Sequence, residues 1–452
     1  MNFISEAKQF TNPEDMAAAY LAEYFGNQKI EYPINPFKML KDEGILFSFR
    51  DFNKLEGVYI PSASEEDLPV VGINVNRPIT RQRFTAAHEL CHHFRDSGKQ
   101  ISCPIGSKNS IEVFAEKFAA ALLMPKNELR AQVNRRKNNN GNVSFDDVLE
   151  IADYFGVSFQ ACLFRIAYLV HAISGNTESD ELKKRINKYG PDKERKRRHM
   201  TNVKLYEDLI DCYQEQLAFK PTDHARLLFQ NEYIYNDSRM EGIEVTFEQA
   251  SEIVTDLRLK MQNSEYCNQD NEAFLSIAGH FDMYQEIFAE PVKESLDIYY
   301  LITLNKLLFS HYPHPEFGGT TRQNNALVIG SKFETVDHHE IYNELAKVNN
   351  QVMDLYSKRN TISMSEYIES VVRIHHQITV IHPFADGNGR TSRVFLNVQL
   401  IRAGIMPVYI KVEDKKEYIE ALSKADQFGD YNELIEIIFK LIIRSSADLS
   451  KW

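Results

Sequence analysis

The sequence predicts a mainly α-helical protein with an α+β region at its N-terminal side and an all-helical region toward its C-terminus. Apolar residues recur at helical spacing through most of residues 202–452. Three short runs rich in β-branched and aromatic residues lie between residues 45 and 76, which indicates a small sheet. A polar, basic segment over residues 174–201 predicts a linker between domains spanning 1–173 and 202–452.

Length, charge and cysteine content limit the classes of protein to which the chain can belong. A chain of 452 residues is long enough for two to four domains. Its net charge of −12 argues against a general nucleic-acid binder, because phosphate contacts need clustered Lys and Arg. Five cysteines without paired short spacings suggest no disulfide framework. No apolar run approaches a membrane span and no signal-peptide pattern opens the chain, so we expect a reducing, ATP-containing cytoplasm.

The N-terminal region begins with a helix and a sheet. Residues 14–25 are rich in alanine and carry apolar side chains at helical spacing, which predicts the first helix. The runs over 45–49, 57–60 and 70–74 predict the strands of the small sheet. The last run leads toward the motif His88-Glu89-Leu90-Cys91-His92.

This motif has the spacing of a zinc site. Residues four apart share one face of a helix, so the imidazoles of His88 and His92 can reach one tetrahedral Zn²⁺. Glu89 would lie beside the open coordination position and take a proton from a bound water, whose pKa the metal lowers. Because this short pattern also recurs by chance, a helix bearing surface histidines is the alternative interpretation.

A third ligand is expected on a second helix, which should run from Ser110 to Met124 and end before Pro125. On that helix Glu112 and Glu116 share a face with alanines that would let it pack closely on the histidine helix. One carboxylate can complete a His₂Glu site while the other orients a ligand histidine. The spacing alone leaves open which glutamate binds the metal.

The segment from about residue 10 to 170 resembles the ImmA/IrrE family of metallopeptidases. The resemblance rests on the sequences RFTAAHELCH, over residues 83–92, and FAAALLMP, over residues 118–125. It implies a zincin-like α+β fold, zinc peptidase activity and a protein substrate. Cys91 stands where relatives usually have glycine, and we interpret it as a small buried helix residue rather than a metal ligand or an oxidisable thiol.

The resemblance also implies a ligand set. The family's ligands are two histidines and a downstream glutamate, which correspond to His88, His92 and Glu112. Relatives often have a second acidic residue where this chain has Phe114, so Glu116 remains the alternative third ligand.

Two further segments have alternative interpretations. The predicted helices within residues 144–170 are separated by a glycine turn and could be taken for a DNA-reading helix-turn-helix, but the second helix lacks basic residues. The basic residues between 183 and 198 favour a solvated linker or helix, with a patch for an acidic partner as the alternative.

The C-terminal region is organised around residues 382–393, HPFADGNGRTSR. Glycines let the backbone approach an anion closely, and the N–H groups at a helix start favour phosphate. Arg390 and Arg393 share a helix face and can grip a polyphosphate. Asp386 offers hard oxygen ligands for a phosphate-bound Mg²⁺, and His382 can accept a proton near neutral pH.

The same stretch matches the motif H-P-F-x-[DE]-G-N-[GK]-R-x-x-R in full, and the chain resembles the Fic family. The resemblance implies an all-helical fold and transfer of AMP from ATP to a Ser, Thr or Tyr hydroxyl of a target protein. It assigns proton abstraction to His382, Mg²⁺ binding to Asp386, phosphate binding to Gly387, Asn388 and Gly389, neutralisation of the leaving pyrophosphate to Arg390, and γ-phosphate contact to Arg393. A Gly/Asn turn capped by arginines is the alternative, and some relatives transfer UMP, phosphate or phosphocholine instead.

Two other Fic features have counterparts here. In the inhibitory helix of that family, with the pattern [ST]-x-x-x-E-[GN], the glutamate pairs with the second motif arginine, here Arg393, and blocks the γ-phosphate. Glu241 and Gly242 fit this pattern, whereas Asp237 stands where Ser or Thr is expected. Residues 317–330 resemble the β-hairpin flap that would bind an extended target segment by strand addition. On the helix that leads to the motif, His375 should be buried and His376 should be exposed.

The sequence thus predicts a bifunctional cytoplasmic enzyme, a zinc peptidase fused to an AMP transferase, with an oligomeric state that it does not define. One alternative makes the peptidase the effector that cleaves a transcriptional repressor, with the Fic half sensing nucleotide. Another makes the first domain a docking module without catalysis, although His88, Glu89 and His92 are all present.

Overall fold

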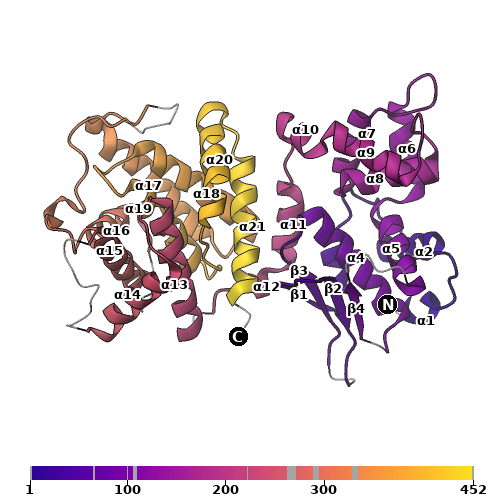
Figure 1. The fold of residues 1–452 in the computed structure, drawn as a ribbon, viewed down its shortest axis with the longest axis horizontal. Helices are drawn as coiled ribbons and strands as arrows, with labels where there is room; N and C mark the ends of the chain where they lie inside the picture. The colour runs from indigo at the N-terminus through magenta and orange to yellow at the C-terminus, as the bar shows by residue number, and fades with distance from the viewer. Residues whose placement is uncertain are drawn as a thin grey trace. The chain divides into compact units, whose positions relative to one another are not determined.

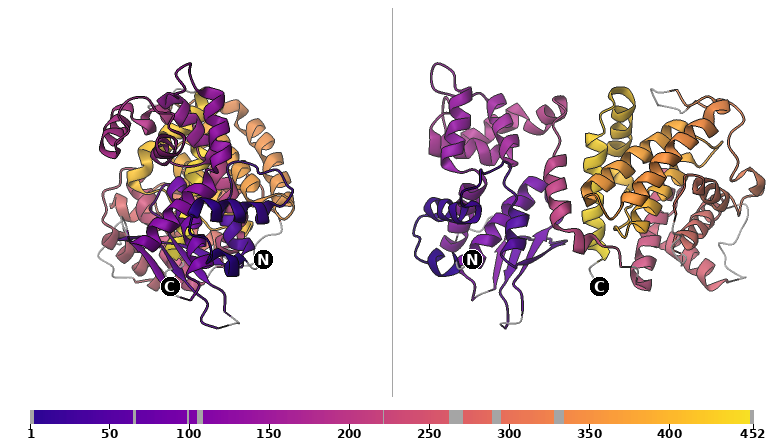
Figure 2. Two further views of the ribbon diagram at one scale, coloured as in Figure 1. Left: turned by 90° about the vertical axis from the view of Figure 1, so that its right-hand side faces the viewer. Right: turned by 180° about the vertical axis from the view of Figure 1, so that it is seen from behind.

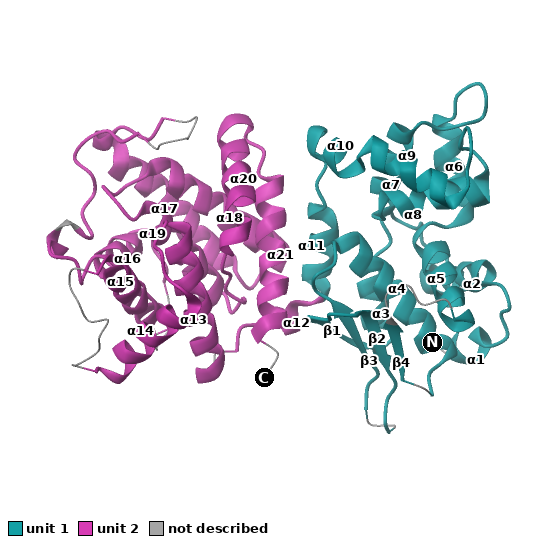
Figure 3. Ribbon diagram, in the orientation of Figure 1, with its two compact units in different colours: residues 1–212 teal, residues 213–452 magenta. Residues whose placement is uncertain are grey.

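The computed structural model describes residues 3–64, 67–98, 100–104, 109–220, 222–261, 271–288, 295–327 and 334–449. The chain folds into two compact units, residues 1–212 and 213–452 (Figure 3). It is mainly helical, with one small mixed sheet in unit 1 and a helical unit 2, which confirms the predicted fold class (Figure 1).

Unit 1 combines helices with the sheet. Its helical elements are α1 (Phe3–Ala7), α2 (Pro13–Phe25), α3 (Pro36–Asp42), α4 (Ile79–Arg95), α5 (Ser110–Leu123), α6 (Lys126–Arg136), α7 (Phe145–Phe155), α8 (Phe159–Arg165), the π-helical turn η1 (Ile166–Val170), α9 (Ser179–Tyr189), α10 (Pro191–Arg197) and α11 (Val203–Cys212). The side chains of Asn12 and Asn109 cap α2 and α5 by accepting backbone N–H bonds. Helices predicted over 14–25 and 110–124 are therefore confirmed.

The sheet has four strands in the order β1-β3-β2-β4. These are β1 (Leu46–Arg50), β2 (Leu55–Ile60), β3 (Val70–Asn74) and β4 (Ile101–Pro104). β1 runs parallel to β3, whereas β2 pairs antiparallel with both β3 and β4. The three predicted strands are confirmed; β4 was not predicted, and it places Cys103 opposite Gly57 at one edge of the sheet.

Helix α4 packs on β2 and β3 of this sheet (Figure 2). Close packing is possible because Gly57 has no side chain. A Cβ atom at Gly57 would lie 2.4 Å from Glu89 Oε1 and 2.5 Å from the Thr85 methyl. The glycine therefore lets the helix that carries His88 and His92 lie directly against β2.

Residues 174–201, for which the sequence predicts a linker, contain α9 and α10. Two arginines of this basic run form ion pairs with aspartates of α7: Arg195 with Asp153 at 2.8 Å, and Arg198 with Asp146 at 2.7 Å. The division between compact units falls after residue 212, and the domain limits at residues 173 and 202 remain predictions.

Unit 2 is built from helices around an aliphatic and aromatic core. Its helical elements are α12 (Gln214–Leu217), α13 (Asp223–Met240), α14 (Phe247–Leu259), α15 (Glu272–Ile287), α16 (Tyr300–Leu308), η2 (Pro315–Phe317), η3 (His338–Glu340), α17 (Ile341–Lys358), α18 (Met364–Ile381), α19 (Asn388–Arg402), η4 (Val412–Asp414), α20 (Lys415–Phe428) and α21 (Asn432–Leu449). Helix α19 is buried along almost its whole length, and it packs against α16 and α18.

The segment predicted as a flap is only partly described, because residues 328–333 lie outside the described ranges. Its described part begins at the last residue of η2 and includes Thr321, which forms an isolated antiparallel bridge with Phe384. A hairpin over 317–330 therefore stays a prediction. None of the helices within the described ranges is both long and apolar enough to cross a membrane.

Candidate active sites in the two units

Helices α4 and α5 bring together three of the predicted metal ligands. His88 Nε2 lies 3.1 Å from His92 Nε2 and 3.2 Å from Glu112 Oε2. His92 Nε2 lies 3.5 Å from Glu112 Oε1, and its Nδ1 lies 2.9 Å from Asp96 Oδ2. The side chains of His88, His92 and Glu112 are all buried. The Asp96 carboxylate can therefore orient His92 from outside the cluster, as partners of metal-binding histidines do.

A fourth donor comes from β4. The Cys103 thiol lies 3.4 Å from His88 Nε2 and 3.9 Å from Glu112 Oε1, and the donor atoms of the four residues all lie within 4.8 Å of one another. Cys103 was not predicted as a ligand, whereas Cys91 was considered and interpreted as a buried helix residue. The one sequence signal for Cys103 was its place in the short run Ile101-Ser102-Cys103, between the two helices that carry the other donors.

The structure separates the two candidate glutamates. Glu112 is buried with the histidines, whereas Glu116, one turn later on α5, is exposed and lies outside the cluster. Burial raises the pKa of Glu112, but the hydrogen bond from His88 and the charges of both histidines outweigh it, so the net shift is downward. A carboxylate that stays ionised is the form that binds a metal.

Glu89 is the fully buried carboxylate of the motif. Neither of its oxygens accepts a hydrogen bond from any part of the chain that the structure describes. Burial raises the pKa of Glu89 to about 7. A buried acid with two unsatisfied oxygens beside a cluster of metal donors is a candidate proton acceptor.

The donor set suits a zinc ion. Imidazole nitrogen, carboxylate oxygen and thiolate sulfur are the three ligand types that zinc takes in proteins. Burial lowers the pKa of His88, which keeps this imidazole neutral and able to bind a metal. Burial and the neighbouring Glu89 and Glu112 carboxylates raise the pKa of the Cys103 thiol, so only a bound cation would favour its thiolate.

In unit 2 the end of α18 positions His382. This residue has φ of 51° and caps the helix, with its N–H bonded to the carbonyl of Ile378. The left-handed backbone, uncommon for a residue with a side chain, turns the chain into the loop that precedes α19. Burial, with help from the Arg322 charge, lowers the pKa of His382, whereas a hydrogen bond with the Thr379 backbone opposes this shift.

The loop between α18 and α19 is closed by its own polar groups. Asn388 accepts the Phe384 N–H and donates to the Phe384 carbonyl, each at 2.8 Å. Gly387 has φ of 77°, and a Cβ atom there would lie 2.7 Å from Leu308 and 2.9 Å from Phe309. The glycine therefore allows the start of α19 to pack directly on the end of α16.

Two side chains of the loop and of the first helical turn face each other. Arg390 Nη2 lies 3.4 Å from both carboxylate oxygens of Asp386. The Asp386 side chain is 73% exposed, whereas the Arg390 side chain is 7% exposed and lies over the Phe309 ring. The accessible carboxylate fits an octahedral Mg²⁺ that keeps most of its waters.

Arg393 is held by two carboxylates of α13 and its C-terminal cap. Its Nε donates to Asp237 Oδ1, and its Nη2 donates to Glu241 Oε1 at 2.6 Å. Asp237 is buried and also contacts His280 Nε2 at 2.8 Å. Although burial favours the neutral acid, the Arg393 charge and the His280 contacts lower the pKa of Asp237 to about 2. Thus Asp237, at the position where Ser or Thr was expected, anchors the end of α13 through an ion pair.

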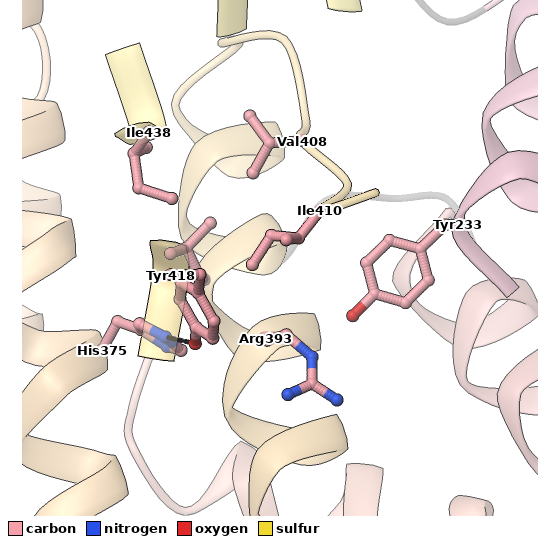
Figure 4. A pocket seen from close by; sticks show the side chains of 8 residues that line it. Tyr233, His375, Arg393, Val408, Ile410, Tyr418 and Ile438 are labelled. Atoms are coloured by element: carbon pink, nitrogen blue, oxygen red, sulfur yellow. Dashed lines mark hydrogen bonds between the residues drawn. The ribbon is translucent and has the colours of Figure 1, made fainter. Parts of the chain in front are cut away.

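The inner side of Arg393 borders a small cavity of about 10 Å³ (Figure 4). The space is large enough for one water molecule at most. His375 and Tyr418, joined by a 2.6 Å hydrogen bond, lie beside it, and burial lowers the pKa of His375 to about 3. His375 is therefore a core residue, as predicted.

The prediction that its neighbour His376 is exposed was wrong. His376 is buried, with Nε2 2.7 Å from Asp426 Oδ1 and Nδ1 3.3 Å from the Tyr431 hydroxyl. These partners belong to α20 and to the turn before α21, which the local pattern of α18 does not reveal.

Arg322 is a residue of the second site whose role sequence reasoning missed. Its Nε donates to the His382 carbonyl at 2.8 Å and its Nη2 donates to the Ile381 carbonyl at 3.3 Å. Its backbone N–H donates to the Pro383 carbonyl at 2.9 Å. The side chain is buried and thus fixes the backbone on both sides of His382. An arginine at the end of the sequence Gly-Gly-Thr-Thr-Arg carries no local signal of this contact.

The fold and these sites define a two-unit protein with a buried group suited to a metal in the first unit and an anion cradle at a helix start in the second. Two protein-family models match parts of the chain. The model of the IrrE N-terminal-like domain matches residues 40–167, and the model of the Fic/DOC family matches residues 295–400. The chain therefore carries an IrrE N-terminal-like domain, which includes the His/Cys/Glu cluster, and a Fic/DOC domain, which includes residues 382–393.

Curated relatives of the chain are Fic protein adenylyltransferases. It is 33% identical over 125 residues to protein adenylyltransferase fic-1 of Caenorhabditis briggsae, covering 28% of this chain and 23% of that protein. It is 40% identical over 78 residues to protein adenylyltransferase Fic of Nematostella vectensis, covering 17% of this chain and 18% of that protein. The chain thus spans less than a quarter of the length of these relatives.

Two solved structures of Fic proteins show a partial likeness to the chain. A Fic domain containing signaling protein from Bacteroides thetaiotaomicron is 20% identical, with a TM-score of 0.42 and coverage of 55% of this chain and 95% of that chain. Fic-1 from C. elegans is 18% identical, with a TM-score of 0.44 and coverage of 73% of this chain and 97% of that chain.

Proposed function

We propose that unit 2 transfers AMP from ATP to a hydroxyl side chain of a protein. The observation that carries the proposal is the position of His382, which ends α18 in a left-handed conformation and is followed by the glycine-bounded start of α19. The helix start offers backbone N–H groups to phosphate, and Arg390 and Arg393 add two guanidinium groups on its first turns. Membership of residues 295–400 in the Fic/DOC family supports the same activity.

The chemistry assigns each group a role. The neutral imidazole of His382 accepts the proton of the target hydroxyl as its oxygen bonds to the α-phosphorus. The bond from that phosphorus to the bridging oxygen breaks, and pyrophosphate leaves with its charge balanced by Arg390. Gly387, Asn388 and Gly389 supply N–H groups to the phosphates. Mg²⁺, when bound through Asp386, would neutralise part of the phosphate charge.

Glu241 is proposed as an inhibitory residue. Its carboxylate holds Arg393 at 2.6 Å, so the guanidinium is already paired and cannot also bind a γ-phosphate. The Glu241 side chain is 34% exposed, in contrast to Asp237 at 3%, and is therefore the more easily displaced partner. Loss of this carboxylate should release one edge of the guanidinium.

The test is labelling of protein by ATP that carries a label on its α-phosphate, with Mg²⁺ present. Glu241→Gly should raise labelling of the chain or of lysate proteins by about tenfold or more, and adding His382→Ala should abolish it. His224→Ala, an exposed histidine at the far end of α13, serves as the control and should leave labelling unchanged. Equal labelling by the His382→Ala variant would refute the transfer role, and mass spectrometry of the adduct would distinguish AMP from another transferred group.

We propose a second function, zinc-dependent peptide hydrolysis, for unit 1. The observation that favours it is the convergence of His88, His92 and Glu112 beside the buried, unpartnered carboxylate of Glu89. Zinc bound by these ligands would supply a Lewis acid and a water of lowered pKa. Glu89 would hold the proton taken from that water and pass it to the leaving amine.

Metal analysis tests this site. The purified chain should hold about one zinc per molecule, and His88→Ala should lose it. His171→Ala, an exposed histidine elsewhere in unit 1, should retain the metal. A wild-type chain that binds no metal would leave unit 1 as a binding module. The proteins modified or cleaved, including a repressor, stay predictions.

A further inference from the structure

Among the described residues of unit 1, four metal donors lie together rather than the predicted three, and their spacing fits one coordination sphere. Zinc bonds of about 2.0 Å to nitrogen or oxygen and about 2.3 Å to sulfur place tetrahedral ligands roughly 3.3 to 3.6 Å apart. The separations among His88, His92 and Glu112 are 3.1, 3.2 and 3.5 Å. The Cys103 sulfur lies 3.4 Å from His88 and 3.9 Å from Glu112. One ion can therefore reach all four atoms after small side-chain adjustments.

The backbone fixes the position of Cys103. Its strand β4 pairs antiparallel with β2, and the register sets Cys103 opposite Gly57, the residue that lets Glu89 and its helix approach the sheet. Cys103 is 4% exposed, so the sulfur is enclosed with the other donors rather than directed to solvent. Cys91, on the same helix as the histidines, is also buried but does not join the cluster.

We propose that Cys103 is a fourth metal ligand and closes the site. The inference rests on the proposed zinc site and concerns the position that a zinc peptidase reserves for water. Four protein ligands are characteristic of a closed site, whereas catalytic sites keep one position open. When the metal binds, the S–H bond of Cys103 is replaced by a metal–sulfur bond and the proton passes to solvent.

Glu89 is the group that such a closed site would leave idle. A carboxylate that activates water needs that water within hydrogen-bond distance. Both Glu89 oxygens are buried, and neither meets the geometric criteria for a hydrogen bond with a described residue. With Cys103 bound, unit 1 is a resting peptidase. Displacement of the thiolate from the metal would open the water position beside Glu89.

Cobalt substitution of the full-length protein tests the proposal without relying on activity. A thiolate bound to Co²⁺ gives a charge-transfer band in the near ultraviolet that nitrogen and oxygen ligands do not give. The wild-type chain, loaded with one Co²⁺, should show this band. Cys103→Ala should lose the band but keep one metal ion, with affinity weakened by about 10- to 100-fold or more. Cys91→Ser, the matched control on α4, should keep the band.

The outcomes distinguish loss of the thiolate ligand from loss of the whole zinc site. A wild-type chain that binds Co²⁺ without the band, or a band that persists in Cys103→Ala, would overturn the thiolate ligand while leaving the zinc site intact. A chain that binds no metal at all would overturn both. Hydrolysis of labelled casein adds a second readout: Cys103→Ala should cleave faster than wild type, and equal or faster cleavage by wild-type protein would show that Cys103 does not close the site.

Discussion

At the scale of single residues, Arg393 forms two ion pairs to which we assign different roles. Asp237 holds the guanidinium from a fully enclosed position, and His280 satisfies the second oxygen of this carboxylate. Glu241 holds the other edge from a position that is one-third exposed. Removing one partner of a buried pair leaves an uncompensated charge, whereas solvent compensates a more exposed one. We therefore assign structural anchoring to Asp237 and reversible inhibition to Glu241.

The first prediction compares these carboxylates. Asp237→Asn should destabilise unit 2 by roughly 3 to 5 kcal/mol, because Arg393 and His280 lose their buried anion. Glu241→Gln, the matched control, should cost about 1 kcal/mol or less. Urea unfolding of the full chain measures both. Equal losses would contradict the assignment of different roles.

The same pair has a defined pH dependence. The folded-state pKa of Asp237, about 2, lies below the ordinary value for aspartate, so its carboxylate adds stability that is fully present above that ordinary value. This contribution is lost as the pH falls toward about 2. Wild-type protein should therefore lose more stability on acidification over this range than Asp237→Asn, which cannot take up the proton.

A second prediction concerns the proton acceptor. Because burial lowers the pKa of His382, the imidazole stays neutral at pH values where an ordinary histidine is half protonated. Transfer by the Glu241→Gly variant should thus persist below pH 6.5, with kcat/KM falling only as the pH passes the lowered pKa. A profile that is half-lost at or above pH 6.5 would show that burial does not control this group.

At the scale of elements, α19 is bounded by glycines with similar backbones and different surroundings. Gly387, before its first turn, has φ of 77° and abuts Leu308, Phe309 and Asn305 of α16 and its end. Gly404, just past its last turn, has φ of 71°, and a Cβ atom added there would meet no heavy atom of the described residues within 4 Å. Both positions therefore have a left-handed backbone that would strain a residue with a Cβ atom, but only the first also has a packing constraint.

The third prediction uses this contrast. Gly404→Ala should cost about 1 to 2 kcal/mol through left-handed backbone strain alone. Gly387→Ala should cost more and also reduce transfer by about tenfold or more, because the added methyl would push the loop after His382 away from α16. Thermal unfolding and the labelling assay report the two effects. Similar losses of activity in both variants would contradict a specific role for the packing at Gly387.

Elements with local signals were predictable, and those that depend on partners were not. The helices over 14–25 and 110–124 and the strands before α4 follow from neighbouring residues in the chain. β4 has only four residues and exists through pairing with β2, so Cys103 could not be placed from the sequence. Glu112 and Glu116 share a helix face, and only the packing of α5 on α4 brings the first, rather than the second, to the histidines.

In the inhibitory segment and the loop of His382, too, contacts between residues far apart in the sequence could not be predicted from local patterns. Glu241 was expected to meet Arg393 because the resemblance supplied a pattern, and the 2.6 Å contact agrees with it. The contribution of Asp237 could not be derived, because it depends on His280 from another helix. Arg322 likewise acts on His382 across 60 residues of sequence. Local periodicity carries no information about such contacts.

At the scale of the whole molecule, each unit has its own core and its own candidate site. The metal donors belong to α4, α5 and β4 of unit 1, whereas the anion cradle and its inhibitory partner belong to α13, α18 and α19 of unit 2. A unit with its own core can unfold as a separate cooperative transition. A ligand stabilises the unit that binds it by an amount set by its concentration relative to its dissociation constant.

The fourth prediction follows from this separation. Calorimetry of the full chain should show two unfolding transitions, one for each unit. Removing zinc with a chelator should lower the midpoint temperature of the unit 1 transition only, and His88→Ala should lower the same transition. ATP with Mg²⁺ at about 100 times its dissociation constant should stabilise only the other transition, by about 2.7 kcal/mol. The ATP shift should grow in Glu241→Gly, because Arg393 is then free to bind phosphate. If either ligand moved both transitions together, the two sites would be energetically coupled rather than independent.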